Sequence, residues 1–182
     1  DVLFGDVSPS GRLAETWYSS LPENDAKFSK DYKKALYNES IFVGYRYSET
    51  AGVPVAFPFG YGLGYSFVKW SNATISAKEK NKVTLGVTLQ NIGEKAESEV
   101  VQIYAENCDS RMFREKKRLV GFGKVTLKAG EKKTVTVSVP VEELACYDTD
   151  KSCFTVNGGK YAFYVARDCR DDRFVLEYEV KG

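Results

Sequence analysis

The stretch KVTLGVTLQN, residues 82–91, carries an apolar side chain at every second position from Val83 to Leu89, and Thr84 and Thr88 stand between them. Successive side chains of a β-strand point to opposite faces of its sheet. A period of two therefore places one face in a core and the other toward water. We expect residues 82–91 to form a half-buried strand.

The same alternation recurs along the chain after Trp70. The other stretches that carry it are residues 99–107, 118–127, 132–140, 160–167 and 173–180. Turn-forming sequences such as NIGEK and VNGGK separate them. About seven strands at this spacing predict an all-β fold, a two-sheet antiparallel sandwich of the immunoglobulin or fibronectin type III class.

Tyr161 occupies a telling position in this predicted sandwich. It follows the VNGG turn and opens the next-to-last strand. In sandwiches of this class a tyrosine at that corner bonds back to the backbone a few residues upstream. We expect a structural role for Tyr161.

The four cysteines, Cys108, Cys146, Cys153 and Cys169, show no C-x-x-C spacing, which argues against a zinc or redox motif. The first and last fall at opposite ends of neighbouring predicted strands, so we expect no bridge between them. Cys146 and Cys153 flank one connection and could pair. Free thiols are the expectation, and they favour a cytoplasmic over a secreted protein.

Residues 1–67 differ in composition and pattern from the rest of the chain. They contain four of the five prolines and little hydrophobic periodicity. We expect a loop-rich segment without a core of its own, with one short helix over residues 27–36. Its most distinctive part is FPFGYGLGYS, residues 57–66. Three glycines suggest a phosphate loop, but their spacing misses G-x-G-x-x-G and no helix pattern follows. Stacking on sugars and packing between domains remain, and packing is favoured.

The composition excludes several kinds of function. The net charge is only +1, so no nucleic-acid partner is expected, and no apolar run is long enough for a membrane helix. The chain has no histidine, which removes Ser–His and Cys–His catalysis and the commonest transition-metal ligand. We expect neither a metal nor a cofactor.

Two segments resemble glycoside hydrolase family 3. DVLFGDVSPSGRLAETW, residues 1–17, is similar to the end of that family's second domain, where Leu-Phe-Gly-Asp leads into Pro-x-Gly-Arg-Leu. YNESIFVGYRYSETAGVPVAFPFGYGLGYSF, residues 37–67, is similar to the segment that closes the domain. Residues after 90 resemble its C-terminal fibronectin type III-like domain. Gly64 departs from the pattern, since the family usually has Ser there.

The resemblance implies a division of the chain and a parent enzyme. Residues 1–67 would be the end of an α/β sandwich domain with a linker, and residues 68–182 the fibronectin type III-like domain. The parent would be a retaining, exo-acting β-glycosidase of the β-glucosidase or β-xylosidase kind. Its nucleophile and acid–base motifs do not occur in this sequence, so Asp6 and Glu39 are not assigned catalytic roles. The start without Met fits part of a longer protein.

Two functions follow as hypotheses. In the first, the sandwich buttresses its partners, which are the catalytic domains of the parent enzyme. Those domains would act on a β-linked oligosaccharide or aryl glycoside, and the fragment alone would be inactive. In the alternative, the chain is a carbohydrate-binding or adhesion module that uses exposed aromatics. The candidates for substrate contact are Tyr45, Arg46 and Tyr61. The sequence does not set the sugar specificity or the oligomeric state.

Overall fold

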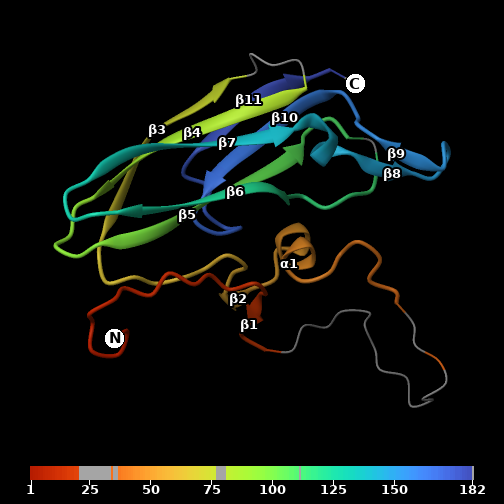
Figure 1. Ribbon diagram of the computed structural model, residues 1–182. Coiled ribbons are helices and arrows are strands. Elements are labelled where there is room, and N and C mark those ends of the chain that lie inside the picture. The colour runs from red at the N-terminus through yellow and green to blue at the C-terminus, as the bar shows by residue number, and fades with distance from the viewer. Residues whose placement is uncertain (21–33, 35–36, 77–80, 111, 182) are drawn as a thin grey trace.

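A computed structural model describes residues 1–20, 34, 37–76, 81–110 and 112–181. The helix expected over residues 27–36 lies outside these residues, apart from residue 34. Seven strands build the main body, which is the upper part of Figure 1. They are β3 (Val68–Ser76), β4 (Lys82–Asn91), β5 (Glu97–Asn107), β6 (Arg118–Leu127), β7 (Lys132–Pro140), β10 (Gly159–Ala166) and β11 (Val175–Val180).

These strands form two antiparallel sheets. One has the order β3-β4-β7 and the other β11-β10-β5-β6. Both consist of the strand sets expected of a fibronectin type III-like sandwich, so the predicted fold class is confirmed. Leu85 and Val139 of the first sheet and Ile103 and Phe163 of the second are at most 1% exposed and meet in the core.

The outer face of the three-stranded sheet is polar, as the alternation predicted. Thr84 of β4 and Ser138 of β7 lie with their hydroxyl oxygens 3.0 Å apart, and Thr88 and Thr134 form a second such pair at 3.3 Å. Cross-strand hydroxyl pairs of this kind stabilise a sheet face that water also reaches.

Several smaller elements were not expected from the sequence, because segments of two to seven residues carry too little periodicity. Two short strands pair between β7 and β10 as a hairpin whose tip contains DTDKS, residues 148–152. The smaller elements are β1 (Trp17–Tyr18), α1 (Tyr45–Ala51), β2 (Val55–Phe57), the 3-10 helix η1 (Val141–Leu144), β8 (Cys146–Asp148) and β9 (Cys153–Thr155).

The expectations for Tyr161 and the cysteines are met. The Tyr161 side chain is fully buried, and its hydroxyl donates to the carbonyl of Asn157 at 2.8 Å, which is the tyrosine-corner bond. All four cysteines are free. The β8–β9 register pairs Asp148, not Cys146, with Cys153, so the two thiols that flank this connection do not face each other.

Candidate functional site

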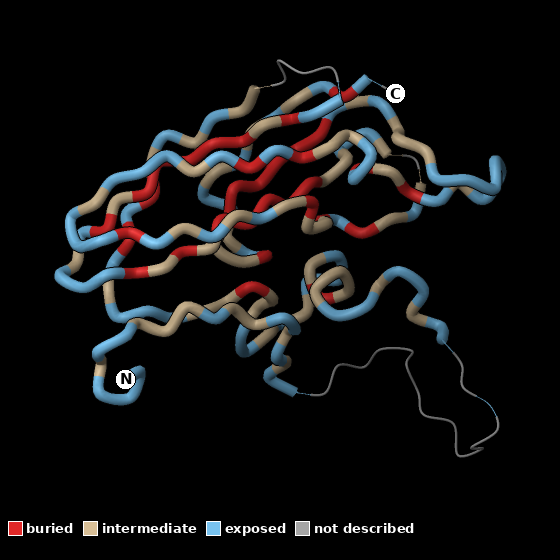
Figure 2. Tube along the Cα trace, in the orientation of Figure 1, coloured by how far each residue is buried: buried red, intermediate tan, exposed pale blue. Residues whose placement is uncertain are grey.

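The outer face of the four-stranded sheet is buried around Tyr104 and Tyr164, in contrast to the outer face of the other sheet. Residues 1–20 and 37–67 run beneath it in Figure 1, and Figure 2 shows buried positions along the strands above them. We call the contact between these two parts the seam. It consists of the buried residues Tyr104, Ala162, Tyr164, Ala166 and Cys169, with Tyr45, Phe59 and Leu119 packed against them.

Two aromatic side chains from residues 1–67 close the seam. The rings of Tyr45, on α1, and Phe59 stack with their centroids 4.6 Å apart, and Tyr45 meets Tyr104 edge-on at 5.9 Å. The Tyr45 hydroxyl accepts a hydrogen bond from the Leu119 amide at 2.9 Å, and the Cys169 amide donates to the Phe59 carbonyl at 3.1 Å. Apolar burial and backbone bonds therefore act together here.

Burial changes the acidity of seam residues. It raises the pKa of the Cys169 thiol to about 12. Burial also raises the pKa of Tyr104 well above its ordinary value, and that of Tyr164 in the same direction, where a hydrogen bond to Glu106 adds to the effect. Desolvation disfavours the ionised forms, so all three groups stay neutral over the ordinary pH range.

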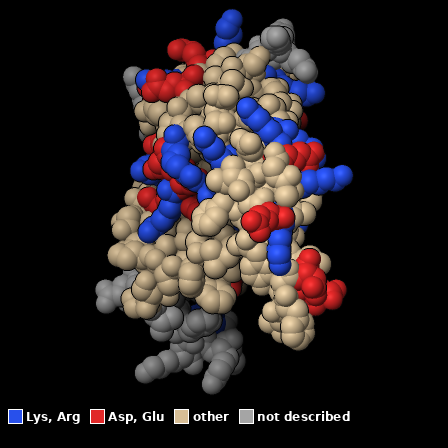
Figure 3. Space-filling model, turned by 90° about the vertical axis from the view of Figure 1, so that its left-hand side faces the viewer, with Lys and Arg blue, Asp and Glu red and all other residues tan. Residues whose placement is uncertain are grey.

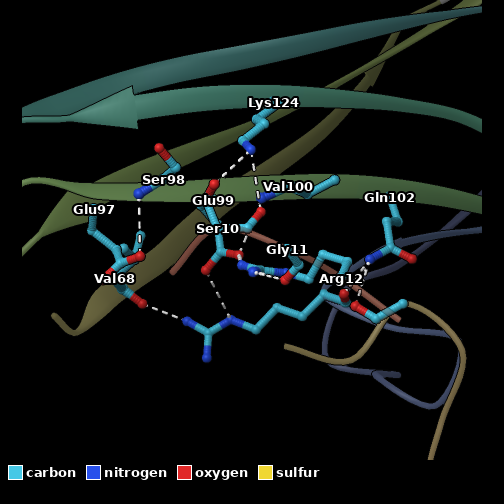
Figure 4. Close-up of polar contacts among 12 residues, drawn as sticks. Ser10, Gly11, Arg12, Val68, Glu97, Ser98, Glu99, Val100, Gln102 and Lys124 are labelled. Atoms are coloured by element: carbon cyan, nitrogen blue, oxygen red, sulfur yellow. Dashed lines mark hydrogen bonds and ion pairs between the residues drawn. The ribbon is translucent and has the colours of Figure 1, made fainter. Parts of the chain in front are cut away.

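Strand β5 contributes three polar side chains that bind the preceding segment, and Figure 4 shows two of them, Glu99 and Gln102, beside Arg12. The Glu97 carboxylate accepts hydrogen bonds from the Ser8 hydroxyl at 2.6 Å and from a backbone amide at residue 66 at 2.9 Å. Glu99 forms an ion pair with Arg12. The Gln102 side-chain amide donates to the carbonyl of Gly60 at 3.1 Å. One strand thus holds the segment at three points.

These contacts explain the glycines of residues 57–66. A Cβ atom on Gly60 would lie 2.1 Å from the Gln102 amide oxygen, and one on Gly64 would lie 2.4 Å from a Glu97 carboxylate oxygen. Gly60 also has a φ of 86°, which favours glycine. At Gly64, where the family usually has Ser, glycine leaves room for Glu97. Residues 57–66 therefore lie close to strand β5, and their glycines leave the space that the β5 side chains occupy.

A groove of about 630 Å³ opens where this segment meets the sheet. Arg167 lies in it, with its guanidinium over the Trp70 ring at 5.3 Å and its Nε 3.8 Å from Glu99. Burial lowers the pKa of Arg167, although the nearby Glu99 opposes this shift. Figure 3 shows basic and acidic side chains intermixed on the left-hand side of the molecule, without one large patch of either sign.

The carboxylates of this groove are already bound by other groups of the chain. Burial would raise the pKa of Asp171, but hydrogen bonds from Arg173 and the Arg167 amide outweigh it and hold that pKa below its ordinary value. Burial raises the pKa of Asp168, whose carboxylate accepts the Arg170 amide at 2.9 Å. Paired and capped carboxylates suit a structural contact, whereas glycoside cleavage needs two of them facing a substrate.

The three candidates for substrate contact are not brought together. Tyr45 packs in the seam, Arg46 is half-buried on α1, and Tyr61 lies in the groove beside Phe57, with ring centroids 5.2 Å apart. Substrate contact by these residues stays a prediction.

The aromatic residues of 57–66 do not all pack against the sandwich. Phe59 does, but Phe57 is 39% exposed and Tyr65 is 52% exposed, so the packing that was favoured for this stretch does not extend to these two residues. Phe57 instead meets Trp17, on the neighbouring strand of the β1–β2 pair, edge-on at 6.0 Å. The Trp17 and Phe57 rings thus pack against each other across the β1–β2 pair, and not against the sandwich.

Two negative observations apply to the described part of the chain. Within it, no three residues of the types His, Cys, Asp and Glu are grouped so that they could hold a metal ion. None of its helices has the length and apolar character needed to cross a membrane.

The geometry is that of a fibronectin type III-like sandwich with a preceding segment packed against its four-stranded sheet. Two family models match the chain in that order: the glycosyl hydrolase family 3 C-terminal domain over residues 1–65 and the fibronectin type III-like domain over residues 99–169. The chain belongs to glycoside hydrolase family 3. Its division between residues 67 and 68 stays a prediction.

Relatives and solved structures agree with this assignment. The chain is 38% identical to thermostable beta-glucosidase B of Acetivibrio thermocellus and 35% identical to an exo-alpha-(1->6)-L-arabinopyranosidase of Bifidobacterium breve, each over all of this chain and 24% of the relative. The structure of DesR, a beta-glucosidase from Streptomyces venezuelae, superimposes with a TM-score of 0.91 at 31% identity, covering 99% of this chain and 24% of that one. The chain thus spans about a quarter of the length of the relatives that it matches.

Proposed function

We propose that the chain is the C-terminal part of a retaining, exo-acting β-glycosidase of the β-glucosidase type, and that it does not hydrolyse glycosides alone. Its work is to hold residues 1–67 in a fixed place against the sandwich, and so to buttress the catalytic domains. The substrate of the whole enzyme would be a β-linked oligosaccharide or aryl glycoside.

The observation that carries this proposal is the burial of the outer sheet face. Tyr104 is fully buried under Tyr45, and Glu97 and Glu99 bind the segment that precedes the sandwich. A sandwich with a solvated outer face could be a freely tethered module, whereas this one is fixed to its neighbour. The names of the relatives support the glycosidase class, and the arabinopyranosidase among them leaves the sugar open.

Inactivity of the chain is tested by an assay with aryl β-glucosides. We expect no turnover above the buffer rate. Turnover that disappears on substitution of one carboxylate, for example Asp168→Asn, would contradict the proposal, because the activity would then belong to this chain.

The buttressing role is tested in a chimera. The C-terminal quarter of the Acetivibrio thermocellus relative is replaced by this chain, and the β-glucosidase activity that survives heating is measured. We expect an active chimera whose half-life at elevated temperature shortens with Tyr104→Ala but not with Thr136→Ala, an exposed position of the other sheet. Equal half-lives of the two variants would contradict the role of the seam.

We also propose a cytoplasmic location, which the four free thiols support. The test is fractionation of the source cells with an antibody against the chain. Recovery of the protein in the medium would contradict this location.

A further inference from the structure

A second cavity, which the proposed function does not use, lies between the turn at residues 38–41, α1 and the loop that follows β5. Its volume is about 400 Å³, within the range of small-molecule sites. We call it the Phe113 pocket. Phe42 and Phe113 form one wall, with ring centroids 4.8 Å apart and planes at 58°. Phe113 is 87% exposed, so its ring presents a bare apolar surface.

The polar part of the Phe113 pocket contains an acceptor that lacks a partner. The Oε2 atom of Glu39 is buried and makes no hydrogen bond within the described part of the chain. A buried carboxylate oxygen in this state costs free energy, so it calls for a donor from outside. Asn38 and Tyr47 add polar groups to the same lining.

The two walls of the pocket are fixed to each other. The Lys116 amide, from the loop after β5, donates to the Thr50 hydroxyl of α1 at 3.0 Å, and that hydroxyl donates to the Arg46 carbonyl at 2.6 Å. Thr50 is therefore engaged in holding the loop to the helix. Because these hydrogen bonds already hold the walls in place, little conformational entropy of the protein is lost when a ligand binds.

The composition of the lining narrows the class of ligand. Among the described residues it contains three aromatic ones and four with polar side chains, no Lys or Arg, and Ala51 as the one aliphatic residue. Glu39 would repel an anion, and an apolar ligand would leave its oxygen without a donor. A ligand with a C–H surface for the rings and hydroxyl donors for the carboxylate satisfies both requirements.

We propose that the Phe113 pocket binds one or two pyranose rings of a neutral saccharide, with a sugar face on Phe113 and a hydroxyl donating to Glu39. The choice of a saccharide over other neutral polyols rests on the proposed function. The site would hold a substrate or product chain without reacting with it, since the pocket offers one carboxylate and no second group for cleavage.

The experiment is an NMR titration of the whole chain with cellobiose and with methyl β-glucoside, following the ring protons of phenylalanine. We expect saturable shifts with a Kd on the order of millimolar, as for weak ligands. Phe113→Ala should weaken binding roughly tenfold through the lost ring contact. Glu39→Gln should weaken it about threefold, because a charge-assisted hydrogen bond becomes a neutral one.

The matched control is Phe154→Ala. Phe154 is 73% exposed and pairs with Tyr147, ring centroids 5.4 Å apart, and neither residue lines the Phe113 pocket. Its replacement should leave the Kd unchanged. Phe113 is almost wholly exposed, so Phe113→Ala should fold normally, which far-UV circular dichroism checks.

Three outcomes would overturn the inference. No saturable shift up to about 100 mM sugar, some hundredfold above a millimolar Kd, would assign the pocket to a peptide segment of the rest of the enzyme. An unchanged Kd in Phe113→Ala would place binding elsewhere, and equal weakening by Phe154→Ala would show unspecific contact with exposed rings. An active chimera without sugar binding would refute this inference alone and leave the buttressing role intact.

Discussion

The two outer faces of the sandwich differ in what covers them. The three-stranded sheet presents threonine and serine to water, in hydroxyl pairs such as that of Thr84 and Ser138. The four-stranded sheet presents Tyr104 and Tyr164, which residues 1–67 cover. Both sheets share the core between them, so they differ only in their outer faces. In this chain one outer face is open to water, and the other packs against the segment that precedes the sandwich.

The largest effect is expected from truncating the covered face. Tyr104→Ala removes a fully buried ring and should lower the free energy of unfolding by about 4 kcal/mol, the usual cost of deleting a buried aromatic side chain. Thr136→Ala, on the open face, should change it by less than about 0.5 kcal/mol. Urea unfolding of both variants measures the difference. Equal costs would remove the distinction between the faces.

The next effect concerns the ion pair that joins strand β5 to the first segment. Glu99→Ala leaves the largely buried guanidinium of Arg12 without its partner and should cost about 3 kcal/mol. The exposed pair of Lys133 and Glu131 is the control, because Lys133→Ala breaks a contact that water screens. Its urea midpoint should barely move. A similar midpoint for the two variants would contradict a buried, anchoring role for Glu99.

The smallest effect appears at alkaline pH. The Cys169 pKa is about 12 in the folded protein against an ordinary value near 9, so the folded state holds this proton more tightly. The resulting stabilisation is complete below pH 9 and is lost as the pH rises from 9 to 12. At pH 10 the loss should be about 1 kcal/mol. Cys169→Ala should flatten this part of the pH profile, and an unchanged slope would contradict the assignment.

Much of this comparison could be predicted from the sequence. The strict alternation in residues 82–91 and 132–140 predicted strands with one polar face, and from their number the all-β sandwich. This was possible because a period of two can be read within a few neighbouring residues. The run YAFYVA, residues 161–166, is buried at all six positions. In this stretch the positions between the alternating ones are apolar as well, and a run of this kind indicates a strand covered on both faces. This signal could have predicted the seam.

Other parts could not be predicted from local patterns. Arg12 and Glu99 are 87 residues apart, and nothing in either neighbourhood identifies the partner. The unpartnered oxygen of Glu39 likewise depends on the way in which a turn, a helix and a distant loop meet. The β8–β9 hairpin was missed because three-residue strands show no period.

Thiol alkylation at pH 8 tests most directly whether the segment that precedes the sandwich closes the seam. Cys153 is exposed and should react quickly, whereas the buried Cys146 and Cys169 should be protected. Cys108 is exposed too, but burial and the nearby Glu106 raise its pKa, so it should react more slowly than Cys153. Phe59→Ala opens the cover over Cys169 alone, so it should raise the alkylation rate of that thiol about tenfold or more and leave Cys146 unchanged, since local opening controls access. If Cys169 reacts as fast as Cys153 in the unsubstituted chain, or if Phe59→Ala leaves its rate unaltered, the covered face is not covered by this segment.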